Sequence, residues 1–319
     1  ISLLEPDSVQ PASFEDFYQR YLDCLRAGEQ LQIEESLLTD EIHREILPLP
    51  FVSLFLDDCV ARGLDCTNGG AVYNTTGLVA VGTATVADSL YAIKRLVYDE
   101  KKLTLGELTE ILRNNFEGQE YLRQFILNRF EKFGNDQDCV DRLAVGITDA
   151  FADELEKHHN SRGGAFWGAL YSVSAQVGLG NVCCAPPDGR LDGLPLSDGL
   201  TPMYGMDRNG PTAVLASLSK IHQKRFPNGI IVNQRMSGSL FKTPDGREKM
   251  AQLLRAFVAA GCFHWQFNIV DNKVLLAAQK DPDEYRSLVV RVAGYSAIFV
   301  ELSVKAQNSI IDRYEADLA

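Results

Sequence analysis

Cysteine is scarce in this chain of 319 residues and stands in none of the patterns that define a metal or disulfide framework. The seven cysteines are an odd number, and no two of them have the C-x-x-C spacing of zinc and iron–sulfur sites. Such usage is typical of a reducing compartment. No apolar run approaches the roughly 20 residues that a membrane-spanning helix requires. These absences argue against a disulfide scaffold, a structural metal site and a membrane span.

Positive charge is also in short supply. Lysine and arginine number 31 against 43 aspartates and glutamates, which gives a formal net charge of -12, and no basic cluster interleaved with aromatics appears. A nucleic-acid-binding protein is therefore not expected, and the acidity is explained by solubility. The 45% apolar and 23% charged content is near the average of soluble domains, so we expect a sizeable core and a cytoplasmic location.

Hydrophobic periodicity predicts a mostly helical first half, followed by a more β-rich second half. The predicted helices cover about 14–35, 51–62, 83–100, 105–114, 120–132, 138–158 and 241–259. The predicted strands cover about 169–173, 230–233 and 262–270. The Gly/Pro/Asp-rich passage 178–211 is expected to be ordered, because apolar side chains recur throughout it. Helices alternating with short strands indicate an α/β fold.

One glycine close to the C-terminal end carries the sharpest functional signal. Gly294 stands in Arg-Val-Ala-Gly-Tyr-Ser-Ala (291–297), shortly after the strand-like run 288–292, which is rich in valine. A carbon-centred backbone radical needs a planar Cα that overlaps both neighbouring peptide groups, and glycine has no Cβ to obstruct this. An isolated glycine after such a run more often only ends a strand in a turn. The motif alone leaves both interpretations open.

Many other segments support the radical interpretation, because they resemble, in the same order, segments of the pyruvate formate-lyase-like superfamily of glycyl radical enzymes. They are 62–65, 69–74, 84–90, 115–118, 187–190, 195–199, 209–214, 264–268 and 298–303, followed by the segment 304–316. The resemblance runs from about residue 14 to residue 318. So many ordered matches make coincidence an inadequate explanation.

The resemblance implies the second half of a ten-stranded α/β barrel, built in the family from two five-stranded half-barrels, with a C-terminal glycyl radical domain. Residues 1–232 would belong to the barrel and 233–319 to the glycyl radical domain. The family's catalytic cysteine, typically in a Gly-Cys-x-Glu setting, is absent from this sequence. Since that cysteine precedes all matched segments in the family, the chain is expected to be the C-terminal part of a longer polypeptide. The pair Cys183-Cys184 is expected to be ordinary buried thiols.

The resemblance also assigns residues to the radical loop. Gly294 would be the catalytic residue that stores the radical, and Arg291, Tyr295 and Ser296 would support its loop. His264 alternates with two amide residues on a predicted strand. It is expected to hydrogen-bond the surroundings of the loop rather than to bind a metal, and no metal site is expected in this chain.

Substrate contacts are expected from the strand that resembles the family's substrate-facing one. Period-two alternation predicts Ala169, Tyr171 and Val173 on one face of that strand. Tyr171 could hydrogen-bond a substrate oxygen or cap the cavity, and Trp167 could form an apolar wall. The alternative is that both aromatics belong to the core. Some family members that bind anionic substrates carry arginine at the position of Trp167, so its indole disfavours a sulfonate.

The activity implied by the resemblance is that of a glycyl radical lyase that cleaves a C–X bond. Dehydration of a small hydroxylated substrate is the leading expectation. No bound cofactor is expected, because a radical SAM activating enzyme would install the radical on the protein itself. Further partners would be the small-molecule substrate and the N-terminal half of the same enzyme, in a homodimer. The host would be an anaerobic prokaryote, with the cytoplasm or a bacterial microcompartment as the location.

Three alternatives remain open at this stage. The chain could be a non-catalytic radical-bearing module for a separate cysteine-containing protein. It could also belong to a formate C-acetyltransferase, which predicts a Cys-Cys pair in the upstream loop, or to an arylacetate decarboxylase.

Overall fold

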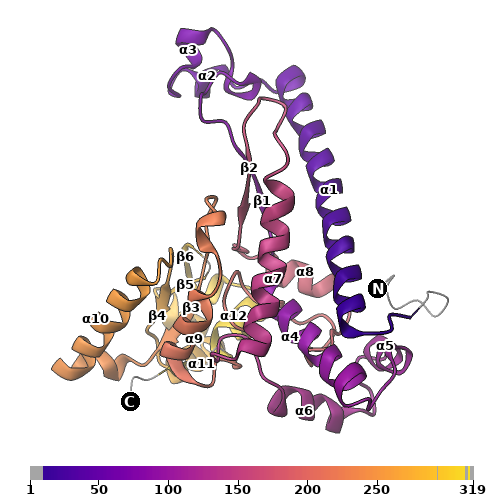
Figure 1. Cartoon of the computed structure of the whole chain (residues 1–319). Helices are drawn as coiled ribbons and strands as arrows, with labels where there is room; N and C mark the ends of the chain where they lie inside the picture. Colours follow the sequence, from indigo (N-terminus) through magenta and orange to yellow (C-terminus); the bar gives the residue numbers. More distant parts are fainter. Residues whose placement is uncertain (1–9, 293, 313–314, 317–319) are drawn as a thin grey trace.

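The computed structural model describes residues 10–292, 294–312 and 315–316, and its helices outnumber its strands (Figure 1). The α-helices are α1 Phe14–Ile46, α2 Pro50–Ser53, α3 Cys59–Arg62, α4 Thr83–Ile93, α5 Leu105–Arg113, α6 Glu120–Arg129, α7 Asp138–Leu155, α8 Ala175–Val182, α9 Gly210–Ser219, α10 Pro244–Ala259, α11 Asn272–Lys280 and α12 Val304–Ile311. The strands are β1 Thr76–Val79, β2 Phe166–Ala169, β3 Asn233–Met236, β4 Gln266–Asn268, β5 Val289–Arg291, β6 Ser296–Ile298 and β7 Glu315–Ala316.

The first helices differ from the predicted ranges in ways that local chemistry explains. Helix α1 begins as predicted, where the Ser13 hydroxyl caps the N–H of Asp16 at 3.1 Å, but it continues well beyond residue 35. The predicted helix 51–62 is instead two short helices, because Asp58 between them has a φ of +75°. The helix predicted to reach residue 100 changes to a π-helical turn at Lys94–Asp99.

Parallel strand pairs follow one another in chain order. Strands β1 and β2 are parallel, Leu170 then forms a parallel bridge with Ile230, and β3 is parallel to β4. Helices connect these strands, which is the arrangement of an α/β fold. The fold class predicted from the sequence is thereby confirmed in its α/β character.

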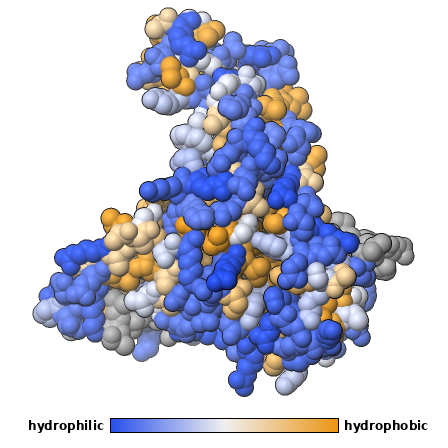
Figure 2. Space-filling view, viewed as in Figure 1, coloured by the Kyte–Doolittle hydropathy of each residue, from blue (hydrophilic) through white to orange (hydrophobic). Residues whose placement is uncertain are grey.

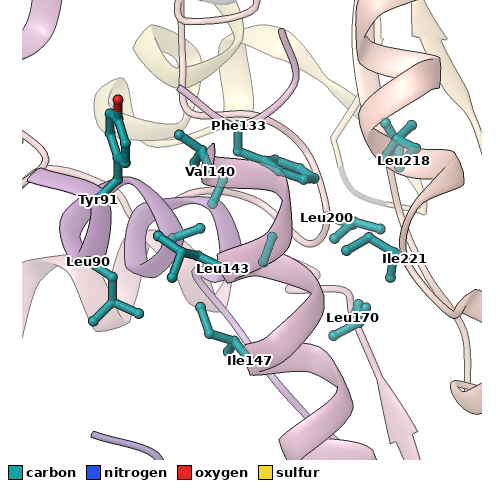
Figure 3. Close-up of a cluster of buried hydrophobic side chains, with 14 of the residues drawn as sticks. Leu90, Tyr91, Phe133, Val140, Leu143, Ile147, Leu170, Leu200, Leu218 and Ile221 are labelled. Atoms are coloured by element: carbon teal, nitrogen blue, oxygen red, sulfur yellow. The ribbon is translucent and has the colours of Figure 1, made fainter. Parts of the chain in front are cut away.

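The largest core lies where α4, α7 and the end of β2 meet, and α7 runs through its centre (Figure 3). Leu90 on α4 and Val140 on α7 are buried there, and Leu170, just after β2, closes the opposite side. Gly168 is needed for this packing. A Cβ at Gly168 would approach Phe226 to 3.1 Å.

A projecting arm is formed by the C-terminal half of α1 together with α2 and α3 (Figure 1). Large apolar side chains are exposed on it, and several are visible at the top of Figure 2. They are Ile46, Leu47, Leu49, Phe51, Leu54, Phe55 and Val60, here called the arm patch. Such a concentration of exposed apolar groups is unusual for surface that only faces water.

A second, smaller core holds the C-terminal part together. It consists of buried side chains of α11, of β5, of the 3₁₀ turn Phe299–Glu301 and of α12. Its members are Leu275, Ala278, Val290, Val292, Phe299 and Ile310. This core fixes the hairpin of β5 and β6 against two helices. None of the helices in the described part of the chain is long and apolar enough to cross a membrane.

Candidate active site

Gly294 lies in the tight turn that joins the antiparallel strands β5 and β6. The N–H of Val292 donates to the carbonyl of Tyr295 at 2.9 Å and closes this turn. Gly294 has a φ of +86°, in the left-handed region that favours glycine. A Cβ at this position would lie 3.0 Å from Cδ1 of Ile231. Both backbone conformation and space therefore call for glycine, independently of any radical chemistry.

Side chains of the hairpin brace the turn from either side. Arg291, the last residue of β5, donates from Nη1 to Oγ of Ser296, the first residue of β6, at 3.0 Å. Gly294 itself is exposed, and Tyr295 beside it is 37% exposed. The Cα of Gly294 is thus presented at the surface of the described residues by a hydrogen-bonded hairpin.

Strand β4 supports this hairpin with side-chain amides. Asn268 donates from Nδ2 to the carbonyl of Arg291 at 2.8 Å and accepts from the N–H of Arg291 at 2.9 Å. Gln266 accepts from the N–H of Gly294 at 3.1 Å. The opposite face of this segment is aromatic, since Trp265 packs on Phe257 of α10 at 5.0 Å between ring centroids. Period-two alternation therefore sends the amides to the hairpin and the rings to the helix.

A row of buried polar side chains continues from Gln266 into the body of the protein. Gln266 donates from Nε2 to Oδ1 of Asn233, the first residue of β3. Asn233 donates from Nδ2 to Oδ2 of Asp198 at 2.6 Å, and Ser172 donates from Oγ to the other oxygen of Asp198. Gln266, Asn233, Asp198 and Ser172 are each at most 5% exposed, and we call them the polar row.

Within the described residues, His264 does not make the hydrogen bond to the loop's surroundings that the sequence predicted. Its Nδ1 has no hydrogen-bond partner among the described residues. Burial lowers the pKa of His264 below its usual range, and the nearby charge of Arg291 lowers it further. The role in holding the loop belongs instead to Gln266 and Asn268. In the described part of the chain, no group of three or more His, Cys, Asp or Glu side chains could hold a metal ion.

The residues predicted to face substrate lie in β2 and just beyond it. Strand β2 covers Phe166–Ala169 rather than 169–173, and Val173 has a φ of +55°, so strand alternation does not extend to it. Trp167 points away from the core face of β2 and is 36% exposed. Tyr171 is half-buried and directly precedes Ser172 of the polar row.

Cys183 and Cys184 are not the buried thiols that the sequence predicted. Cys183 is half-buried and Cys184 is exposed. Their carbonyls accept hydrogen bonds at 3.0 and 2.6 Å from Arg190, whose guanidinium is buried in the passage after α8. Arg190 also donates to the carbonyl of Leu191 at 3.0 Å. This passage is ordered, as the sequence predicted, because one guanidinium satisfies several of its carbonyls.

Sequence reasoning missed Asn233, Asp198 and Ser172. One signal could have found them, because β3 reads Asn-Gln-Arg-Met and all four residues are buried. Three polar side chains in a buried strand need partners. The sequence does not show where those partners lie, since Asp198 and Gln266 are far from β3 along the chain.

A cavity of about 340 Å³ lies away from Gly294, between α4, the passage after α8 and α12. Asp88 and Lys132 are both buried at its wall, and the Asp88 carboxylate accepts the N–H of Phe133 at 2.8 Å. Burial raises the pKa of Asp88 to about 7, although the Lys132 charge acts in the opposite direction. Asp88 is therefore a buried acid that stays protonated up to near-neutral pH.

Comparison with known proteins places this architecture in a family. The pyruvate formate lyase-like family matches residues 4–180, and the glycine radical domain matches residues 196–300. The chain is 37% identical over 303 residues to trans-4-hydroxy-L-proline dehydratase of Clostridioides difficile, covering 95% of this chain and 38% of the relative. It is 38% identical over 283 residues to (2S)-3-sulfopropanediol dehydratase of Klebsiella oxytoca, covering 87% of this chain and 34% of the relative.

A solved structure agrees in fold as well as in sequence. The glycerol-bound B12-independent glycerol dehydratase from Clostridium butyricum superposes with a TM-score of 0.92 at 40% identity, over 96% of this chain and 39% of that one. The chain belongs to the pyruvate formate lyase-like family and contains its glycine radical domain. It spans somewhat more than a third of the length of the relatives it matches.

Proposed function

We propose that this chain is the radical-storing part of a glycyl radical lyase, with Gly294 as the residue that carries the unpaired electron. The observation that carries the proposal is the position of Gly294 at an exposed turn, within the part of the chain that matches the glycine radical domain. In this proposal residues 1–232 contribute to the barrel and 233–319 form the glycyl radical domain.

The chemistry requires five hydrogen-atom transfers, one for activation and four in each turnover, and these balance. A radical SAM activating enzyme takes one Cα hydrogen atom from Gly294 and leaves the radical there. The Gly294 radical takes the hydrogen atom of a cysteine thiol, supplied by the rest of the enzyme, and the resulting thiyl takes one from a substrate C–H. After the substrate radical loses its leaving group, the product radical recovers a hydrogen atom from the cysteine, and Gly294 then returns its own to the thiyl.

A small hydroxylated compound is the substrate class we propose, and loss of water is the reaction. The support lies in the relatives, which are named for the dehydration of hydroxyproline, sulfopropanediol and glycerol. Tyr171 would bind a substrate oxygen, while Trp167 and Val173 would form the apolar side of a substrate site in the complete enzyme. Since one of these relatives is named for a sulfonate, the indole of Trp167 alone does not decide between neutral and anionic substrates.

Two kinds of protein contact follow from this proposal. The exposed hairpin is the surface that the activating enzyme must reach, with Arg291 and Ser296 holding it in shape. The arm patch would pack against the cysteine-bearing half of the enzyme, because its apolar side chains are exposed in this chain. We further propose a homodimer in the cytoplasm or a microcompartment of an anaerobic prokaryote.

Electron paramagnetic resonance tests the proposal. The complete enzyme, reconstituted with its activating enzyme without oxygen, should give a doublet from the single hydrogen left on Gly294, and Gly294→Ala should remove it. Gly261→Ala is the matched control, because Gly261 also has a positive φ, +73°, and lies in the same C-terminal part with open space around it. A doublet that persists in Gly294→Ala would end the assignment.

A further inference from the structure

The polar row has only one orientation that satisfies all its members. A carboxylate can only accept, so Asn233 must turn its Nδ2 toward Asp198 and its Oδ1 toward Gln266. Gln266 must then donate from Nε2 to Asn233, which leaves its Oε1 facing the N–H of Gly294, a group that can only donate. The Asp198 carboxylate at one end and the Gly294 N–H at the other therefore fix the orientation of both side-chain amides.

Every hydrogen bond in this row is directed toward the Asp198 carboxylate. Ser172 donates to the same carboxylate from the other side. In a buried environment each bond polarises the next, so the negative end strengthens Oε1 of Gln266 as an acceptor. All four side chains of the row are buried. They come from β3, β4, the segment between β2 and α8, and the passage after α8, where the N–H of Leu200 donates to the carbonyl of Ile231 at 3.0 Å.

From this geometry we propose that Gln266, backed by Asn233 and Asp198, is a positioning residue for the Gly294 radical. The inference rests on the proposed function for its chemical meaning. A glycyl radical is stabilised when its amide nitrogen donates electron density and its carbonyl withdraws it. A strong acceptor on the Gly294 N–H increases that donation and holds the amide plane in one orientation.

The first test measures the Gly294 N–H itself and needs no radical. In the ¹⁵N-glycine-labelled chain, the Gly294 signal is assigned by its loss in Gly294→Ala. Gln266→Met keeps a side chain of similar length but removes the acceptor, and exchange of the Gly294 N–H with solvent should accelerate about tenfold, the equivalent of one lost hydrogen bond. Exchange within twofold of the wild type would overturn the proposal.

The chain offers a close control in Gln223. Gln223 is 5% exposed, as is Gln266, and it accepts the N–H of Phe263 at 3.1 Å and donates to the carbonyl of Leu218 at 2.9 Å. Gln223→Met therefore loses the same kinds of bond elsewhere and should leave Gly294 exchange unchanged. If Gln223→Met accelerates it equally, the effect of Gln266 is only structural and the proposal falls.

The conservative variant Gln266→Glu adds a pH signature. A protonated glutamate can donate to Asn233 and accept from Gly294, whereas an ionised one places oxygen against the oxygen of Asn233. Protection of the Gly294 N–H, corrected for the intrinsic pH dependence of exchange, should approach the wild type at pH 5 and fall at pH 8. A pH-independent profile in this variant would contradict the polarised row.

The second readout is the radical. In the activated enzyme, Gln266→Met should widen the doublet, because less spin moves to nitrogen and more remains at Cα, and it should lower the radical yield several-fold. Asp198→Asn should widen the doublet less. An unchanged splitting in Gln266→Met would contradict the electronic role. A wild-type enzyme without any doublet would instead refute the proposed function. Solvent exchange of the Gly294 N–H would still show whether Gln266 is its hydrogen-bond acceptor.

Discussion

The side-chain amide of Asn268 forms two hydrogen bonds, at 2.8 and 2.9 Å, with the backbone carbonyl and N–H of Arg291. It satisfies the same backbone groups that a neighbouring strand would. This contact holds the end of β5 directly before the Gly294 turn. Among the described residues, β5 and β6 form a two-stranded sheet, so no further strand pairs with β5. Asn268 is therefore the residue that satisfies the backbone of β5 at Arg291, beside the packing of the second core.

Asn268→Ala should loosen the hairpin without unfolding the body. Two partly buried backbone groups of Arg291 lose their partner, which costs about 2 kcal/mol locally. Hydrogen-exchange mass spectrometry should show faster exchange in β5 and β6. Asn128→Ala is the control, because the exposed Asn128 side chain bonds to Gln124 of the same helix, α6, and to Arg208, and to no residue of the hairpin. Equal exchange of the hairpin in both variants would show that Asn268 is dispensable.

Replacing Gly294 lowers the stability of the fold, and this effect can be separated from the loss of the radical. Alanine there meets the φ of +86° and lies 3.0 Å from Ile231, so Gly294→Ala should lower the free energy of unfolding by about 1–2 kcal/mol. Adding Ile231→Val removes the crowding methyl and should restore part of the loss in urea unfolding. The double variant should still give no radical, and recovery of the doublet in it would refute the role of Gly294.

Stability should fall as the pH rises from about 4 to about 7, because of Asp88. Its pKa is about 7 in the folded chain and near 3.8 when unfolded, so the folded state binds the extra proton across this window. The contribution is present below pH 4 and is lost as pH rises through 7, and it is worth up to about 4 kcal/mol. Asp88→Asn keeps an oxygen for the N–H of Phe133.

Urea unfolding at several pH values checks this sign. The wild type should lose stability between pH 5 and pH 7.5, and Asp88→Asn should have a flatter profile over the same range. A variant profile as steep as that of the wild type would place the titration on another group.

The arm patch should matter only where the rest of the enzyme is present. Phe51 and Phe55 are 73% and 75% exposed, so replacing both by serine should change the unfolding of this chain by less than about 0.5 kcal/mol each. In the complete enzyme the same pair should lower the thermal midpoint by several degrees. Tyr121→Ser, at an 86% exposed tyrosine outside the arm, should do neither. An unchanged midpoint in the complete enzyme would show that the arm contacts nothing there.

Tyr171→Phe removes only a hydroxyl, from a residue just beyond β2. If this hydroxyl binds a substrate oxygen, turnover by the complete enzyme should fall by about tenfold or more, since one hydrogen bond is lost, while the radical signal stays at the wild-type level. Anaerobic kinetics and spin quantification on the same sample separate the two effects. Unchanged kinetics would return Tyr171 to a packing role.

The sequence predicted the helix-rich α/β fold, and it indicated a turn at Gly294 after a strand-like run, because these depend on local pattern. It did not predict that β2 begins at Phe166, since an apolar run bounded by glycines fits several registers. The polar row could not be predicted from the sequence, for another reason. Its bonds join residues such as Ser172, Asp198 and Asn233, and only the tertiary fold brings these together.

The exposed turn at Gly294 also permits the most direct test of radical storage. The family resemblance implies that oxygen cuts the backbone where the radical resides. After anaerobic activation of the complete enzyme and brief exposure to air, mass spectrometry should find the chain cleaved at Gly294, and Gly294→Ala should stay intact. A wild-type chain that remains uncut there, in a sample with a proven radical signal, would place the unpaired electron on another residue.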